Sequence, residues 1–210
     1  MHTRIAGLLT LSTLFVLSGC ATMSADECAM SDWRTIGYED GSMGYTAARI
    51  GEHRKACAKH GVAPDFNAYQ TGHSEGVRQY CQPSRAFNVG AGGGRYNGIC
   101  PSDLEPDFVD AFNSGHRLYQ LRSNVNSANY QINARRAELE RTEDQIRQAE
   151  ADLIDPETPT EDRILLLVDL KDYAERKGAL EAEIVELIEE RAGYERDLAA
   201  YEAYIADSGF

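Results

Sequence analysis

Residues 118–154 read LYQLRSNVNSANYQINARRAELERTEDQIRQAEADLI, and residues 160–205 read TEDRILLLVDLKDYAERKGALEAEIVELIEERAGYERDLAAYEAYI. Each stretch carries one stripe of positions that alternate by three and four residues. An average spacing of 3.5 residues keeps such a stripe facing a partner helix, which is typical of a coiled coil. The first stripe is Leu121, Val125, Ala128, Ile132, Arg135, Leu139, Thr142, Ile146, Ala149 and Leu153. The second is Leu166, Leu170, Tyr173, Lys177, Leu180, Ile184, Leu187, Arg191, Tyr194, Leu198, Tyr201 and Ile205.

The two stripes are interrupted by a turn near residues 155–159, which contains two prolines. The spans 118–153 and 166–201 have equal length, so folding back at the turn pairs Leu153 with Leu166 and Leu118 with Tyr201. At a rise of 1.5 Å per residue this antiparallel hairpin would reach roughly 50–55 Å. An intermolecular coiled coil is the alternative.

The N-terminus has the pattern of an export signal. One arginine, Arg4, precedes an uncharged apolar stretch that is too short to span a bilayer, and Leu17-Ser18-Gly19-Cys20 follows. This tetrapeptide resembles the lipobox of bacterial lipoproteins, which implies removal of residues 1–19 and lipidation of Cys20. Residues 20–27 would then be a lipidated tether, and Ala21 favours the outer membrane in such lipoproteins. The alternative is a secreted protein with a chance cysteine.

Charge and cysteine usage narrow the class of protein. The net charge is −13, and the part from Leu118 onward holds 22 acidic and 11 basic side chains. Such a surface disfavours nucleic acid and anionic headgroups as partners. The remaining cysteines are Cys28, Cys57, Cys81 and Cys100, an even number that predicts two disulfides in an exported chain. Three connectivities are open, and we favour nearest neighbours.

The cysteine-containing part, residues 28–117, is expected to be a small domain of short glycine-rich helices. A helix is predicted from Phe66 to Cys81 with Asp65 as its N-cap. Its two glycines, Gly72 and Gly76, indicate close backbone approach to another helix, because glycine otherwise costs a helix about 1 kcal/mol against alanine. An aromatic-x2-Gly pattern recurs in Tyr38-x2-Gly41, Phe87-x2-Gly90 and Phe112-x2-Gly115. The fold class is thus mainly α, a disulfide-stapled domain followed by a helical hairpin from residue 118 to 210.

Three residues are candidates for a ligand site: Trp33, Asp40 and His53. A carboxylate beside aromatic rings could bind a sugar or act as an acid, but the interpretation that we favour for Asp40-Gly41 is a turn or a cap. His53, Cys57 and His60 have a spacing seen in metal sites, but an oxidising compartment favours a disulfide for Cys57. The segment Gly90–Arg95 lacks the lysine and hydroxyl residue of a phosphate-binding loop, so we interpret it as a turn. The sequence therefore predicts no metal or cofactor, and no catalytic residue can be assigned.

The spacing of cysteines, glycines and aromatic residues resembles a bacterial lipoprotein family, the domain of unknown function 2799. The motifs that carry the resemblance are Cys28, Trp33-x3-Gly37-x2-Asp40-Gly41-x2-Gly44, His53-x3-Cys57, Tyr69-x2-Gly72-x3-Gly76-Val77-x2-Tyr80-Cys81, Gly90 and Tyr96-Asn97-Gly98-Ile99-Cys100-Pro101. The resemblance covers residues 26–120 and implies a lipid-anchored envelope protein of Gram-negative bacteria. It implies no reaction and no ligand.

Two functions are consistent with these features. The first is a non-enzymatic scaffold or adaptor of the cell envelope, anchored through its lipid to the outer membrane and facing the periplasm, with an envelope protein or peptidoglycan as partner. The alternative is an envelope enzyme or a glycan-type binder that uses the 28–100 domain. We expect the first.

Overall fold

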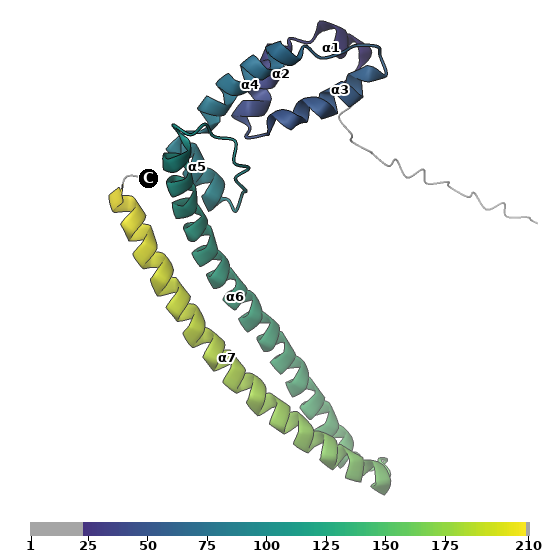
Figure 1. The fold of residues 1–210 in the computed structure, drawn as a ribbon. Coiled ribbons are helices and arrows are strands. Elements are labelled where there is room, and N and C mark those ends of the chain that lie inside the picture. Colours follow the sequence, from purple (N-terminus) through teal and green to yellow (C-terminus); the bar gives the residue numbers. More distant parts are fainter. Residues whose placement is uncertain (1–22, 209–210) are drawn as a thin grey trace, which may run out of the picture.

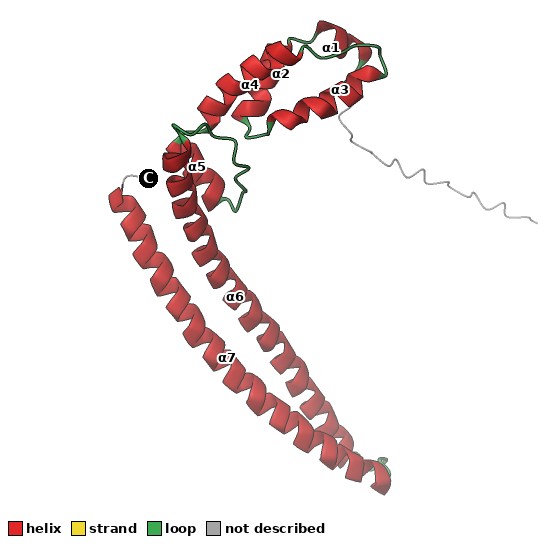
Figure 2. Cartoon of the chain, viewed as in Figure 1, coloured by secondary structure: helices red, strands yellow, loops and turns green. Residues whose placement is uncertain are grey.

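The computed structural model describes residues 23–208, and this part of the chain forms helices and loops with no strand (Figure 1, Figure 2). The elements in chain order are α1 (Ala25–Met30), α2 (Trp33–Ser42), the 3-10 helix η1 (Ala47–Arg49), α3 (Ile50–Ala58), α4 (Phe66–Tyr80), α5 (Pro83–Ala91), α6 (Glu105–Ile154) and α7 (Thr160–Ser208). The predicted fold class is confirmed: a small disulfide-bonded helical domain is followed by a long antiparallel hairpin. The predicted signal segment and the lipobox lie outside the described residues. Residues 25–27 of the expected tether are the first residues of α1.

Helices α2 and α4 form the first helix pair, in which glycines on both sides bring the backbones into contact. A Cβ atom added to Gly72 would lie 1.8 Å from the carbonyl oxygen of Arg34, and one added to Gly37 would lie 2.1 Å from that of Tyr69. Gly41 and Gly76 approach the opposite backbone in the same way, at 2.3 and 2.1 Å. The predicted close approach is therefore confirmed, and so is the α4 helix, where the Asp65 side chain accepts a hydrogen bond from the Ala68 amide.

Helix α5 and the first turns of α6 form a second helix pair that repeats the first. Gly90 and Gly115 face each other's helix backbones, as Gly41 and Gly76 do in the first pair. Three residues beyond each of Gly41 and Gly90 stands a glycine with positive φ, Gly44 and Gly93. Each of these is covered by a tyrosine ring placed four residues after the partner glycine, at positions 80 and 119. The aromatic-glycine pattern in the sequence thus marks two copies of one helix pair.

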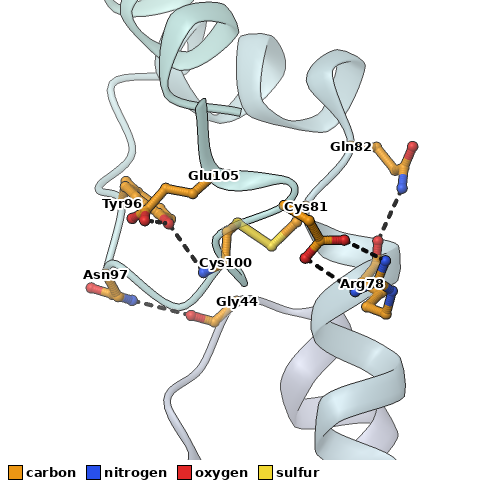
Figure 3. The surroundings of a disulfide bond; sticks show 9 residues. Gly44, Arg78, Cys81, Gln82, Tyr96, Asn97, Cys100 and Glu105 are labelled. Carbon is orange, nitrogen blue, oxygen red and sulfur yellow. Dashed lines mark hydrogen bonds and ion pairs between the residues drawn. A yellow bond between two sulfur atoms is a disulfide. The ribbon is translucent and has the colours of Figure 1, made fainter. Parts of the chain in front are cut away.

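The domain has two disulfides among the described residues: Cys28–Cys57 joins α1 to α3, and Cys81–Cys100 joins the end of α4 to the loop before α6. This is the nearest-neighbour connectivity that the sequence analysis favoured. Figure 3 shows how polar contacts surround the second disulfide: the Tyr96 hydroxyl accepts from the Cys100 amide at 3.0 Å and lies 3.1 Å from a Glu105 oxygen. The amide of Asn97 donates to the Gly44 carbonyl at 3.2 Å. These contacts join the end of the first pair to the start of the second.

The hairpin closes within one chain, in the predicted register. Every position of both predicted stripes is buried or half-buried. Contacts across the hairpin connect the layers that the pairing of Leu118 with Tyr201 implies: the Lys177 ammonium lies 2.8 Å from Glu143, and an Arg191 nitrogen lies 3.1 Å from the amide oxygen of Asn129. The intermolecular alternative is therefore not needed to bury the stripes.

Helix α6 begins at Glu105, ahead of the hairpin boundary at residue 118 and inside the disulfide domain, as Phe108 and Phe112 in the sequence indicate. Its 50 residues correspond to about 75 Å at 1.5 Å per residue. The end of α7 returns to the domain, where Tyr201 and Ile205 pack with Leu118 and the partly buried Phe87. The Tyr201 hydroxyl donates to the Ser114 carbonyl at 2.9 Å. Within residues 23–208, no helix has both the length and the apolar character that crossing a membrane requires.

Candidate functional site

Asp40 is the centre of a buried polar cluster that joins four elements. It lies in the last turn of α2, whose start is capped by Asp32. The carbonyl oxygens of Asp40 and Gly41 accept the amides of Tyr45 and Gly44 in the turn that ends the helix, so the turn or cap interpretation describes their backbone, while the Asp40 side chain has other partners. One carboxylate oxygen accepts from the Nε of Arg49 at 2.9 Å. The other lies 2.8 Å from the Nε2 of His53 and 2.8 Å from the Tyr69 hydroxyl. Helices α2, α3 and α4 and the short η1 turn thus converge on one carboxylate.

The structure brings all three predicted site residues together. The rings of Trp33 and His53 have centroids 6.3 Å apart, and His53 lies 6.1 Å from the ring of Tyr69. Tyr69 stacks on His73, whose Nε2 lies 2.8 Å from the Tyr45 carbonyl oxygen. The result is a row of aromatic rings that covers Asp40, and Asp40 is only 6% exposed.

Each oxygen of the Asp40 carboxylate accepts a hydrogen bond from a neighbouring side chain. Burial of the ring, followed by the hydrogen bond to Asp40, raises the pKa of Tyr69 well above its usual range. Tyr69 therefore stays a neutral donor at physiological pH. Both oxygens of Asp40 are occupied by donors, and the Arg49 charge offsets the cost of burying the carboxylate. Such an arrangement holds the elements that carry Arg49, His53 and Tyr69 in place around Asp40.

The second helix pair shows what the same packing looks like without this cluster. With Gly41 matched to Gly90 and Gly76 to Gly115, Asp40 corresponds to Val89. On the partner helix the matched residues are Tyr69 with Phe108 and His73 with Phe112. The second pair thus reaches the same backbone contact with apolar side chains. Packing of the pair does not require a charged centre, and the cluster serves to fix α3 and η1 against the first pair.

The other predicted candidates are not brought together as a site. Cys57 is in a disulfide and cannot supply a thiolate to a metal, and His60 is an exposed residue beyond the end of α3. The segment Gly90–Arg95 follows the C-terminal end of α5, where the helix dipole repels anions. Its interpretation as a turn is confirmed, since Gly93 has a φ of 72°.

A surface hollow of about 580 Å³ lies where the two helix pairs meet. It is lined by side chains that can exchange hydrogen bonds with a neutral ligand. They include Tyr38, Gln79, Arg85 and Asn88. Neither the sequence pattern nor the candidate residues pointed to this hollow, because its lining comes from three separate helices.

A different kind of surface occurs at the far end of the hairpin. Large apolar side chains are exposed there, and we call them the tip patch. The tip patch consists of Ile154, Ile164, Leu165, Leu167 and Val168. The predicted stripe includes only Leu166 and Leu170 in this region. Five consecutive residues from Ile164 to Val168 are apolar, which is more than a single stripe can hold. That excess was the signal for an exposed apolar surface.

Comparisons with known proteins give a match only for the disulfide domain. No curated protein and no solved structure matches the chain significantly. Residues 32–117 match a family described as protein of unknown function (DUF2799). The match covers both helix pairs and ends where α6 leaves the domain for the hairpin. The resemblance expected from the sequence is therefore confirmed: residues 32–117, which contain both helix pairs, resemble that domain family.

Proposed function

We propose that this chain is a membrane-anchored lipoprotein of the cell envelope that acts as a non-enzymatic scaffold or adaptor. The observation that carries the proposal is the unbroken helix α6, which starts inside the disulfide domain and ends about 75 Å away. A partner held at its far end would be kept at a set distance from the domain.

The position of Met23 connects this arm to the proposed lipid. Met23 packs against the cluster that contains Cys28 and Cys57. Only two residues separate it from Cys20, so a lipidated Cys20 lies within about 10 Å of the packed domain at 3.3–3.6 Å per extended residue. Lipid on Cys20, at about 0.8 kcal/mol per buried methylene, would hold the domain at a membrane surface, with the outer membrane facing the periplasm as its proposed place.

The hairpin is built to keep its length and direction. Ion pairs bridge its two helices: Arg135 lies 2.8 Å from Glu183, and Arg122 lies 2.8 Å from Glu202. Exposed ion pairs add little stability individually, but several of them along a seam oppose sliding of one helix past the other. An arm of this kind keeps its two ends at a more constant distance and direction than a flexible linker does.

The test is photocrosslinking in cells, in the full chain, from exposed hairpin positions: Glu140 and Glu186 in its middle and Leu167 at its far end. A discrete protein adduct supports the adaptor function, and Cys20→Ser should abolish both membrane retention and the adduct. A second variant removes residues 129–149 and 170–190, three heptads from each helix, which keeps the pairing of Leu118 with Tyr201 but shortens the arm by about 30 Å. Absence of adducts from all probes in the folded, lipidated protein would contradict the proposal. An unchanged yield of the same adduct in the variant with the short arm would contradict it as well.

One observation favours a second function, binding of a glycan-type ligand such as a peptidoglycan fragment. The hollow between the helix pairs combines an aromatic ring, Tyr38, with the amides of Gln79 and Asn88 and the guanidinium of Arg85. Rings and amides of this kind bind sugar faces and hydroxyls. Titration of the full chain with a disaccharide of the peptidoglycan, followed by NMR of the hollow's amide groups, tests it. Shifts that disappear in Tyr38→Ala support this function, and their absence at millimolar ligand refutes it.

A further inference from the structure

The segment Ile164–Val168, which follows the polar first turn of α7, is apolar on the side that faces away from α6. At 100° per residue, Leu166 and Leu170 lie on the seam, while Ile164 and Val168 lie on the opposite side of the helix. Leu165 and Leu167 lie between these two directions. All four outward residues are more than half exposed, from 53% for Val168 to 62% for Leu165. A helix that is apolar around its whole circumference normally has a second partner.

The rest of α7 does not share this property. The outward positions further along the helix are acidic, as at Glu175, Glu186 and Glu189. The exposed apolar residue Val185 stands by itself in the middle of the hairpin. The apolar surface is therefore confined to the end of the arm that lies farthest from the disulfide domain (Figure 1). Contiguous exposed apolar patches of this kind mark interaction sites in soluble proteins.

Acidic side chains surround the tip patch. A surface hollow of about 460 Å³ beside Leu165 is lined by aspartates and a glutamate, among them Glu157, Asp162 and Asp169. None of these three carboxylates forms an ion pair with any residue between 23 and 208. The nearest cation, Arg163, is already committed to the carbonyl oxygens of Leu153, Asp155 and Thr158.

We propose that the tip patch is the docking surface for a protein segment that presents an apolar face flanked by lysine or arginine. This inference rests on the proposed adaptor function and names its contact site. An apolar face would cover Leu165, Leu167 and Val168, and the cations would pair with the free carboxylates of the rim. Charge excludes the competing occupants: a second tip would bring acidic rims together, and anionic headgroups would be repelled.

The test compares photocrosslinkers at two matched positions of the full chain in cells, Leu167 at the tip and Val185 in mid-hairpin. Both side chains are 56% exposed and apolar, so they differ only in their surroundings. We expect a protein adduct from Leu167 but not from Val185, and the crosslinked peptide of the partner should be apolar with net positive flanks. An adduct with lipid, with a second copy of the chain or with an acidic segment would overturn the proposal, as would no adduct.

Charge reversal supplies the second arm of the test. The variant Asp162→Lys/Asp169→Lys should lower the yield of the Leu167 adduct at least tenfold, whereas Glu186→Lys/Glu189→Lys, with the same change in net charge, should leave it unchanged. All four positions are exposed, and the folding of each variant is checked by Trp33 fluorescence and far-UV circular dichroism. The neutral Asp162→Asn/Asp169→Asn should give an intermediate yield. Equal yields in all variants would refute the role of the rim.

These outcomes separate the inference from the proposed function. If a probe at Glu186 captures a protein and the Leu167 probe does not, the adaptor function stands and the tip patch is not its contact. If neither probe captures a protein, both fail.

Discussion

Replacing Gly72 with alanine should force the first helix pair apart. The added Cβ atom would lie 1.8 Å from the Arg34 carbonyl oxygen and 3.0 Å from the Tyr38 amide nitrogen, whereas ordinary contacts begin at 3.4 Å. The obstructing atoms belong to the backbone of α2 and cannot rotate away. Helix α2 must therefore move by about 1.5 Å along this direction, which also loosens the contacts of the other three glycines.

The free energy of this change has two opposing parts. Overpacking a well-packed contact costs about 1–3 kcal/mol, and a collision with backbone belongs at the upper end. Alanine regains about 1 kcal/mol of helix propensity relative to glycine. The net loss of stability is thus about 2 kcal/mol, which for a chain of this length lowers Tm by about 4–8 °C.

The assay is thermal unfolding followed by Trp33 fluorescence, since Trp33 is the only tryptophan and is buried at the start of α2. The matched control is Gly178→Ala in α7, where a Cβ atom would meet nothing within 4 Å. The control should gain about 1 kcal/mol from helix propensity alone. If Gly72→Ala were as stable as the wild type, the backbone contact between α2 and α4 would not exist as described.

Three further substitutions test the remaining contacts. Asp40→Asn should destabilise the first helix pair by about 2 kcal/mol in urea unfolding monitored by Trp33 fluorescence, because a buried charge partner is lost; unchanged stability would mean that the cluster contributes nothing. Cys28→Ser/Cys57→Ser should cost about 3–4 kcal/mol in the same assay, since the disulfide closes a loop of 29 residues, while far-UV circular dichroism should retain the hairpin signal. Leu180→Ala, at a fully buried seam position, should cost about 2–5 kcal/mol, against less than about 0.5 kcal/mol for the exposed Val185→Ala. Similar losses at the last two positions would contradict the placement of the seam.

The hairpin was predictable because its information is local and periodic. A stripe at 3.5-residue spacing identifies the buried face without reference to any other part of the chain. Equal stripe lengths on either side of a proline-containing turn then fix the register, and the Lys177–Glu143 contact agrees with it. Phe108 and Phe112 also indicate that this helix begins inside the disulfide domain, but they do not identify Glu105 as its first residue, because its first turns follow the packing of that domain and not the stripe.

The Asp40 cluster could be predicted only in part. Asp40, Trp33 and His53 stood out by residue type, and they do meet. Their partners Arg49 and Tyr69 did not stand out, because nothing in the local sequence shows that η1 and α4 turn toward the same carboxylate. The apolar residues at matching positions of the second helix pair reveal the cluster as an addition to a repeated scaffold. That comparison requires the register of both pairs, which the structure supplies.

The arm has no hinge at its base. Helix α6 contributes Phe108 and Ala111 to the core of the second helix pair and continues without interruption to Ile154. Near the base of the hairpin, Tyr201 and Ile205 of α7 pack on Leu118 of α6, so both helices of the hairpin are in contact with the domain. Displacing the tip sideways therefore requires either bending a two-helix rod along its length or breaking the Tyr201 contacts. The direction of the arm is thus fixed by the same residues that form the domain core, and a partner bound at the tip would be held at a distance and an orientation set by the fold itself.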